Sequence, residues 1–276
     1  MILFDTHMHT EYSTDSTTPL AEQINRAKEI GLQGICITDH MDYDFPSDEW
    51  EKSDEIPFLL DVDDYKKEFQ KKKKTTDFQL LQGIECGLQL TASTVKKNKY
   101  LIENNSWDYV IGSVHLVEKK DPYYPSFWEN KEPHKCIQTY FELILNNIYK
   151  VPEIDSLGHL DYIVRYTPES YRYNPSEFFD ITDEIFKFMI RNDIALEINT
   201  SGWKKAGRCQ NPHFDFLKRY VALGGELITI GSDAHTPEYV AYQFEKIPEL
   251  LKKAGLHQYC IYQKRKPVFY DILLRN

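Results

Sequence analysis

Asp5-Thr6-His7-Met8-His9 is the stretch from which the fold can be inferred. It follows Met1-Ile2-Leu3-Phe4, a short apolar run that is typical of a buried strand. Because residues two apart in an extended chain point to the same side, we expect Asp5, His7 and His9 to project together from the end of this strand. Two imidazoles on one face make half of a transition-metal site, although a buried strand with merely hydrogen-bonded histidines would show the same pattern.

The same pattern recurs near the other end of the chain, where the apolar residues 228–230 are followed by Asp233 and His235. Between the two stretches, strand-like and helix-like patterns alternate about seven times, which favours parallel βαβ units. The further predicted strands are 34–38, 78–84, 109–114, 154–158, 195–198 and 227–230. The predicted helices are 19–30, 62–74, 94–104, 137–148, 175–191, 214–223 and 238 to about 253, after which a basic extended piece is expected.

Nearly every predicted strand ends in a residue type that binds metals. In a β/α barrel the carboxyl ends of all strands meet at one rim, and catalysis takes place there. We therefore predict a single-domain barrel, residues 1–276, that brings together His7, His9, His40, Glu85, His115, His159, Asp233 and His235. The remaining histidines are expected at the surface or in loops: His134, His213 and His257.

Composition narrows the class of protein. With 41% hydrophobic and 28% charged residues and no long apolar run, the 276-residue chain is typical of a soluble globular protein rather than a membrane protein. The five scattered cysteines indicate no disulfide framework, and the N-terminus shows no signal peptide pattern, so we expect a cytoplasmic location. The net charge of −10 disfavours nucleic acid as a partner. A long acidic loop, residues 41–61, is expected to be functional.

Six short motifs, taken together, resemble those of the polymerase and histidinol phosphatase (PHP) family, in its stand-alone histidinol-phosphate phosphatase branch. They are Asp5-Thr6-His7-Met8-His9, Thr38-Asp39-His40, Gly83-Ile84-Glu85, Gly112-Ser113-Val114-His115, Gly158-His159-Leu160-Asp161 and Gly231-Ser232-Asp233-Ala234-His235. The resemblance implies a distorted (β/α)7 barrel with a trinuclear metal site. It also implies hydrolysis of L-histidinol phosphate to L-histidinol and phosphate in histidine biosynthesis.

The resemblance assigns three groups of metal ligands by position. The first is His7, His9, Glu85 and Asp233; the second is Glu85, His115 and His159, with Glu85 bridging; the third is Asp15, His40 and His235. Many relatives have histidine where this chain has Asp15. A carboxylate is a harder ligand and favours manganese, iron or magnesium over zinc, so the three divalent ions are expected to be Zn, Mn or Fe.

The expected chemistry needs no side-chain nucleophile. Two metals sharing a carboxylate lower the pKa of a shared water, and the resulting hydroxide would attack phosphorus while the third metal stabilises the departing oxygen. The partner is then a small-molecule phosphate ester, with no nucleic acid and no membrane, and the protein is a monomer or small homo-oligomer.

Residues near the ligands are candidates for substrate contact, each with a structural alternative. Arg165 and Lys204 would bind phosphate, although Arg165 could instead pair with a loop carboxylate. Arg208 is a further candidate or a solvated loop residue. Asp42 would meet the substrate's ammonium or imidazole, or is simply one acidic residue of its loop. Ser113 would donate a hydrogen bond near phosphate or end its strand.

Asp5 and Asp39 precede predicted ligands and could orient them by accepting hydrogen bonds, or could cap local structure instead. Two other functions stay open from the residues alone. One is a phosphatase of the same type acting on another phosphoester, such as a phosphotyrosine protein or a small nucleotide. The other is a metal-binding domain without turnover.

Overall fold

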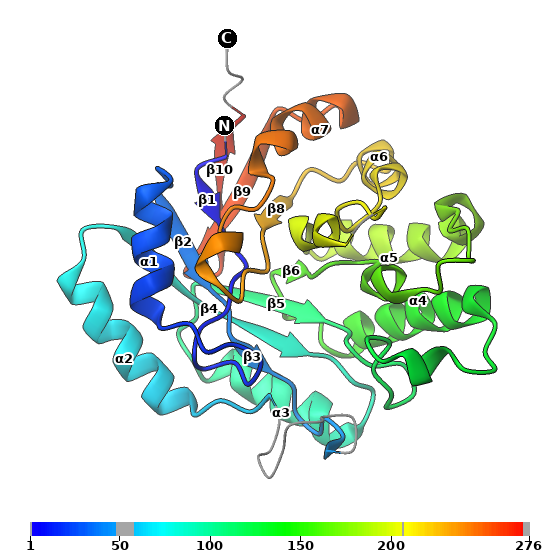
Figure 1. Cartoon of the computed structure of the whole chain (residues 1–276), viewed down its shortest axis with the longest axis horizontal. Coiled ribbons are helices and arrows are strands. Elements are labelled where there is room, and N and C mark those ends of the chain that lie inside the picture. Colours follow the sequence, from blue (N-terminus) through cyan, green and yellow to red (C-terminus); the bar gives the residue numbers. More distant parts are fainter. Residues whose placement is uncertain (1, 48–57, 206, 273–276) are drawn as a thin grey trace.

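Parallel strands form the centre of the molecule and helices surround them (Figure 1). The computed structural model describes residues 2–47, 58–205 and 207–272. Over these residues seven strands pair in parallel, in chain order: β1 (Phe4–Asp5), β2 (Gly34–Ile37), β4 (Gln79–Gly87), β5 (Tyr109–Ser113), β6 (Ser156–Leu157), β7 (Ala195–Asn199) and β8 (Ile228–Gly231). Sheet order therefore follows sequence order, as expected for successive β/α units.

The first and last of these strands approach each other and nearly close the barrel. The amide of Thr6 donates to the carbonyl of Ile230 at 3.0 Å, and the amide of Asp233 donates to the carbonyl of His7 at 2.8 Å. A parallel bridge between Met8 and Ala234 extends this contact. The predicted distorted barrel of seven units is confirmed.

The connecting helices follow the predicted ones closely. They are α1 (Leu20–Glu29), α2 (Val62–Thr75), α3 (Ala92–Glu103), α4 (Pro133–Lys150), α5 (Phe179–Arg191), α6 (Phe214–Ala222) and α7 (Ile247–Ala254). The carboxylate of Asp61 caps α2 by accepting from the amides of Asp63 and Asp64, and Thr91 caps α3. Gly255, with φ of 90°, ends α7 in the left-handed conformation that glycine adopts without strain.

Apolar side chains fill the space between the strands and the helices. In α5, Ile185, Phe186 and Met189 are fully buried, and the helix packs against α4, α6 and β7. Burial of each such side chain contributes about 1.5–3 kcal/mol. None of the helices in the described part of the chain has the length and apolar character needed to cross a bilayer.

The C-terminal region differs from the prediction. The predicted helix from residue 238 is wrong in its first half, where only the short turns η6 (Pro237–Tyr239) and η7 (Phe244–Lys246) form. Ala241 and Gln243 have φ values of 53° and 60°, which interrupt a right-handed helix. The predicted basic extended piece is an antiparallel hairpin, β9 (Gln258–Gln263) and β10 (Lys266–Asp271).

Two strand boundaries also differ. A short strand that was not predicted, β3 (His40–Met41), pairs with β4 opposite Glu85 and Cys86. As a result Glu85, predicted to follow its strand, lies within β4. The predicted helix 175–191 begins as the 3-10 turn η4 (Pro175–Phe178), since Pro175 stands at its first position. The other 3-10 turns are η2 (Pro125–Trp128), η3 (Tyr162–Tyr166) and η5 (Thr200–Lys204).

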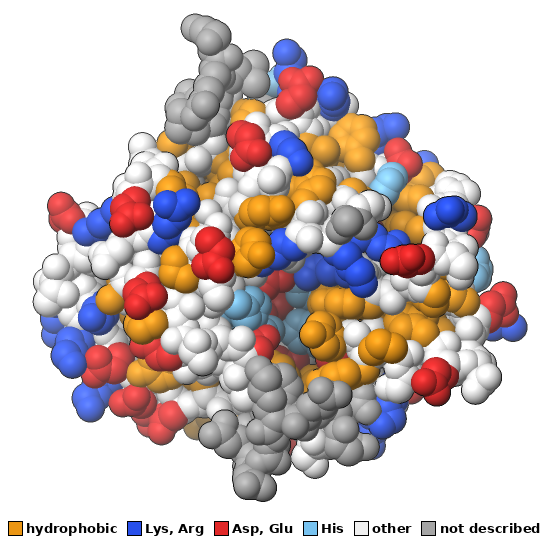
Figure 2. All heavy atoms as spheres, in the orientation of Figure 1, with side chains coloured by type: hydrophobic (Ala, Val, Ile, Leu, Met, Phe, Trp, Pro, Cys, Tyr) orange, Lys and Arg blue, Asp and Glu red, His pale blue; other side chains and the backbone are white. Residues whose placement is uncertain are grey.

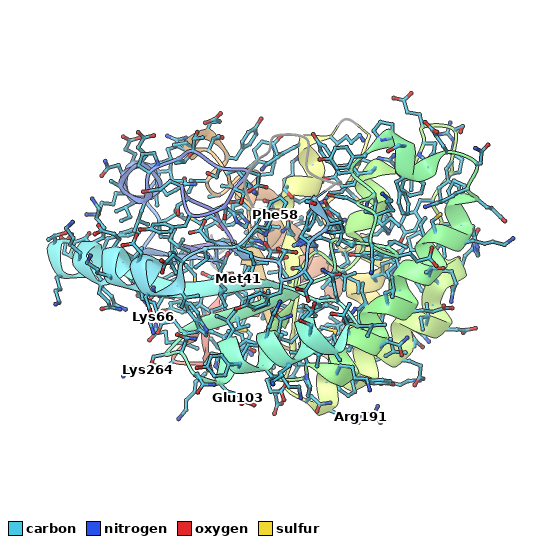
Figure 3. The ribbon with its side chains drawn as sticks, turned by 90° about the horizontal axis from the view of Figure 1, so that it is seen from below. Met41, Phe58, Lys66, Glu103, Arg191 and Lys264 are labelled. Carbon is cyan, nitrogen blue, oxygen red and sulfur yellow. The ribbon has the colours of Figure 1, made fainter. Side chains whose placement is uncertain are left out.

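The carboxyl ends of the strands define one face of the barrel. Figure 3 shows Phe58 toward this face, whereas Glu103, Arg191 and Lys264 lie at the opposite side. These three mark the ends of α3 and α5 and the turn of the hairpin. Residues 48–57 of the predicted acidic loop, which include Asp48, Glu49, Asp54 and Glu55, lie outside the described residues.

Candidate metal centre

A cavity of about 620 Å³ opens among the carboxyl ends of the strands. Figure 2 shows this hollow at the centre of the face, with histidine and acidic side chains at its base and basic side chains along one rim. All nine predicted metal ligands meet at this base, on segments that follow or belong to different strands. The side chains of His134, His213 and His257 lie outside the group of nine. Local strand-end patterns therefore predicted the common location of eight of these residues, and the family resemblance added Asp15.

Four ligand-type atoms of the predicted first group surround one point. His7 Nε2 lies 3.2 Å from Glu85 Oε2 and 3.9 Å from Asp233 Oδ1. His9 Nε2 lies 3.5 Å from the same glutamate oxygen and 3.3 Å from the same aspartate oxygen. Ligands about 2.0–2.2 Å from a tetrahedral zinc ion lie about 3.4 Å from one another. These separations therefore fit a tetrahedral ion.

The predicted second group meets at the other oxygen of Glu85. His115 Nε2 lies 3.3 Å and His159 Nε2 lies 3.0 Å from Glu85 Oε1. Because Oε2 faces His7 and His9, one carboxylate faces both groups. This is the arrangement that a carboxylate bridging two ions requires.

The predicted third group is more open to solvent. Asp15 Oδ2 lies 3.1 Å from His235 Nε2 and 3.7 Å from His40 Nε2. His40 also approaches the first group, since its Nδ1 is 3.0 Å from Glu85 Oε2. The His9 ring stacks against the rings of both His40 and His235, with centroid distances of 4.2 and 4.1 Å.

Buried atoms without hydrogen-bond partners gather in these groups. Among the described residues they include His7 Nε2, His9 Nε2, Glu85 Oε2 and His235 Nε2. A buried polar atom left unpaired costs about 1–3 kcal/mol, so a native protein rarely accumulates several of them without a ligand. The donor set and its orphaned atoms thus fit divalent cations.

The other nitrogen of most of these imidazoles is held by an acceptor. His7 Nδ1 lies 2.5 Å from Glu197 Oε1, and His115 Nδ1 lies 2.7 Å from Asp42 Oδ1. His235 Nδ1 faces the Asp233 carbonyl at 3.1 Å. Since these oxygens only accept, each Nδ1 carries the proton and each Nε2 presents its lone pair to the cluster.

His9 is oriented through a hydroxyl. Ser13 Oγ donates to Asp39 Oδ1 at 2.6 Å, so it accepts from His9 Nδ1 at 3.0 Å. Asp39 also accepts from the amide and hydroxyl of Thr10. Asp39 therefore orients a predicted ligand, but through Ser13, a residue that no sequence motif singled out.

The carboxylate of Asp5 accepts hydrogen bonds from backbone amides and a hydroxyl, and not from an imidazole ring. Its carboxylate accepts from the amide and hydroxyl of Ser232 and from the amide of Ala241. The Asp5 carboxylate therefore contacts residues that follow β8 and is not among the atoms that meet at the cluster, contrary to the expectation that it projects together with His7 and His9. Burial raises the pKa of Asp5 to about 6.

Carboxylates outweigh burial at His7 and His115, whereas burial lowers the pKa of His9 to about 3 and lowers the pKa of His159. Burial alone would lower the pKa of His7, but Glu197, Glu85 and Asp233 raise it well above its ordinary value. For His115, Asp42 and Glu85 likewise outweigh burial and raise the pKa to about 10. An environment that favours protons on imidazoles equally favours bound cations, which compete for the same lone pairs.

The predicted substrate contacts separate into three kinds. Arg165 and Lys204 line the cavity. Asp42 also lines the cavity but is engaged by His115, whereas Ser113 is outside the cavity lining and its Oγ donates to Glu85 Oε1 at 2.6 Å. Arg208 lines a separate cavity of about 350 Å³ and donates to the carbonyl of Thr167, so its predicted place in the main cavity is wrong.

An aromatic wall on the cavity was not predicted. Tyr162 packs against His159 at a centroid distance of 5.0 Å and against Tyr166 at 5.1 Å, and Tyr123 continues the row at 5.4 Å from Tyr166. Lys205 also lines the cavity, with its ammonium 5.3 Å from the Tyr166 ring. These tyrosines and lysines are evident in the sequence, but no local pattern placed them at the cavity.

Comparisons with known proteins agree with this geometry. The PHP domain model matches residues 5–201. A probable histidinol-phosphatase of Clostridium acetobutylicum is 34% identical over 274 residues, covering 98% of this chain and 97% of that protein. The histidinol-phosphatase of Lactococcus lactis is 29% identical over 268 residues, covering 95% of each.

Solved structures extend the likeness to three dimensions. The histidinol phosphate phosphatase of Lactococcus lactis, crystallised with zinc, L-histidinol and phosphate, superposes with a TM-score of 0.84 at 27% identity, covering 96% of this chain and 98% of that one. A histidinol phosphatase structure from Listeria monocytogenes, at 16% identity and a TM-score of 0.72, shares the fold.

Proposed function

Because the chain belongs to the PHP domain family, we propose that it is a metal-dependent phosphatase that hydrolyses L-histidinol phosphate to L-histidinol and phosphate. The observation that carries this proposal is the relative that shares the fold over nearly the whole chain and holds zinc, L-histidinol and phosphate. The buried histidine and carboxylate cluster at the open end of this barrel is consistent with that chemistry. By this function the protein would act in histidine biosynthesis.

Three divalent ions, Zn, Mn or Fe, would occupy the cluster. We assign the first to His7, His9, Glu85 and Asp233, the second to Glu85, His115 and His159, and the third to Asp15, His40 and His235. Divalent ions held there supply Lewis acidity, which activates water for attack and offsets the charge of the phosphate. Glu85 offers an oxygen to each of the first two groups.

Side chains of the cavity wall would orient the ester. Arg165 has its guanidinium held in place by Asn199 and Asn211, so it can meet a phosphate without losing side-chain entropy. The ammonium of Lys204 donates to the carbonyl of Asp233 at 3.1 Å. It would add a second positive charge for the phosphate of the ester. Asp42 then acts through His115 rather than on the substrate.

The tyrosine wall suits the other end of this substrate. Faces of Tyr123, Tyr162 and Tyr166 offer stacking and cation–π contacts to an imidazole or ammonium group.

We further propose a cytoplasmic monomer or small homo-oligomer that binds neither nucleic acid nor membrane. The unpaired state of all five cysteines supports a reducing compartment.

A panel of phosphate esters tests the substrate. Protein stripped of metal and reloaded with Zn²⁺, Mn²⁺ or Fe²⁺ is assayed on histidinol phosphate, a generic aryl phosphate, a phosphotyrosine peptide and a nucleotide. We expect no turnover without metal and the highest kcat/KM on histidinol phosphate. If histidinol phosphate ranks no better than the aryl phosphate, the substrate is wrong while the phosphatase class survives. Bound metal without hydrolysis of any ester would contradict the enzyme itself.

A further inference from the structure

Glu197 is a fully buried carboxylate that is not among the nine ligands, yet it contacts two of them. It lies in the middle of β7. Its Oε1 is 2.5 Å from His7 Nδ1, and its Oε2 accepts from the amide of His159 at 2.7 Å. Asn199, two residues along the same strand, donates to Oε2 at 3.2 Å. Both oxygens of one side chain are thus committed.

The two contacts connect segments that are not neighbours in the barrel. His7 follows β1 and His159 follows β6, with β7 and β8 lying between these strands. In the assignment above, His7 belongs to the first group of ligands and His159 to the second. Glu197 therefore contacts a residue of each group, as Glu85 does through its own two oxygens.

Each contact directs a ring toward Glu85. His7 donates its Nδ1 proton in a hydrogen bond to Glu197, and its Nε2 therefore faces Glu85 Oε2 at 3.2 Å. His159 has φ of 20°, a value that costs a non-glycine residue about 1–3 kcal/mol. The hydrogen bond from its amide to Glu197 helps hold this backbone, which places His159 Nε2 at 3.0 Å from Glu85 Oε1.

A purely structural role accounts poorly for this carboxylate. In the described part of the chain the ion pair recorded for Glu197 is with His7, and neither Lys nor Arg contributes one. A buried carboxylate lacking a cationic partner is costly. The contact between His7 and Glu197 also requires glycine at position 231. A methyl group on Gly231 would overlap His7 Cβ and come within 2.7 Å of Glu197 Oε1.

We propose that Glu197 is a positioning residue that couples the two ligand groups bridged by Glu85, so that ion binding in each depends on it. This inference rests on the metal-dependent function proposed above. It differs from the ligand assignment because Glu197 touches neither ion nor substrate. It acts only through the His7 ring and the His159 backbone.

Zinc binding to the Glu197→Gln variant tests the coupling. The amide keeps the size of the side chain but accepts through one oxygen only, so it cannot satisfy both donors. With Zn²⁺ as the only probe, competition against a chromophoric chelator should show affinity reduced by about 10–100-fold. The measurement is repeated with His115→Ala, which disables the second group, and with His9→Ala, which disables the first. We expect Glu197→Gln to weaken the remaining group in both backgrounds.

Asp155→Asn is the matched control. Asp155 is also a buried carboxylate that accepts from a backbone amide, that of Val110 at 2.8 Å, but it lies at the amino end of β6. This variant should change thermal stability and leave zinc affinity unchanged. Should Glu197→Gln not fold by circular dichroism, Glu197→Asp, which is too short to reach both donors, provides the same measurement.

Each outcome decides the inference. Unchanged zinc affinity in both backgrounds overturns it, and weakening in only one background overturns the coupling. The readout is independent of turnover. A wild-type protein that binds zinc as expected but does not hydrolyse histidinol phosphate would therefore remove the proposed substrate and leave the role of Glu197 standing.

Discussion

Arg165 and Asp233 form an ion pair in which each partner also faces the cavity. Arg165 NH1 lies 3.3 Å from Asp233 Oδ2, while the other aspartate oxygen, Oδ1, lies 3.3 Å from His9 Nε2. Arg165 Nε donates to Asn211 Oδ1 at 2.5 Å, which holds the guanidinium in place. Arg165, which is proposed to bind phosphate, is therefore paired with Asp233, a proposed metal ligand. A displacement of either side chain would displace the other.

Replacing Arg165 should weaken substrate binding. We expect Arg165→Ala to raise KM for the phosphate ester by about 10–100-fold, with a smaller fall in kcat because Asp233 loses a donor. Arg165→Lys should recover part of the KM effect, since charge returns without the planar fork. Steady-state kinetics check both. Arg208→Ala, outside the main cavity, is the control; a comparable rise in KM there would contradict the assignment.

Replacing His159 should stop catalysis without unfolding the protein. His159→Asn removes a proposed ligand of the second group, so kcat should fall by about 100-fold or more. Asparagine tolerates positive φ better than most residues, and in the described structure His159 Nδ1 has no hydrogen-bond partner to lose. Turnover and thermal melting are measured beside His134→Asn, on the half-exposed start of α4. Near-normal turnover would remove His159 from the site.

Replacing Asp15 should change the preferred metal. Asp15 Oδ2 lies 3.1 Å from His235 Nε2, so a histidine at this position can reach the third group. A softer nitrogen ligand favours zinc, and we expect Asp15→His to raise the ratio of zinc-supported to manganese-supported activity several-fold. Asp15→Asn, which removes the charge alone, serves for comparison. An unchanged metal ratio in Asp15→His would show that this residue does not select the ion.

Replacing Arg265 should destabilise the protein in a pH-dependent manner. Arg265, in the turn of the hairpin, pairs with the buried carboxylate of Asp155 and donates to the carbonyl of Glu153. Arg265→Met leaves Asp155 without its cation, and since Arg265 is partly exposed we expect a loss of about 1–3 kcal/mol in the free energy of unfolding.

The sign of the pH effect follows from Asp155. Burial raises its pKa above the ordinary value, and Arg265 opposes that rise. A raised native pKa means that the native state binds the proton more tightly than the unfolded chain does. The cost of the ionised form is therefore present at high pH and relieved on acidification. Urea unfolding of metal-free Arg265→Met should show a larger deficit at about pH 8 than at about pH 5. An equal deficit at both would contradict the role of Asp155.

Local patterns predicted the barrel because each of its units is short. Apolar runs, helical periods and glycine stops lie within a few residues of one another, and they located β2, β5, β7 and most helices to within a few residues. The same patterns failed after residue 238. There a backbone amide, that of Ala241, is held by Asp5 from the start of the chain, and the helix gives way to turns.

The sequence by itself determined which strand-end side chains meet at the rim of the barrel, since parallel strands in a barrel end on one rim and nearly every strand carries a ligand-type residue with it. Only the tertiary structure decided which residues hydrogen-bond to those side chains and hold their orientation. Glu197 is 190 residues from His7, and Asp42 is 73 residues from His115. A hydrogen bond across such a separation depends on how strands pack to within about half an ångström, and no periodicity along the chain encodes that distance.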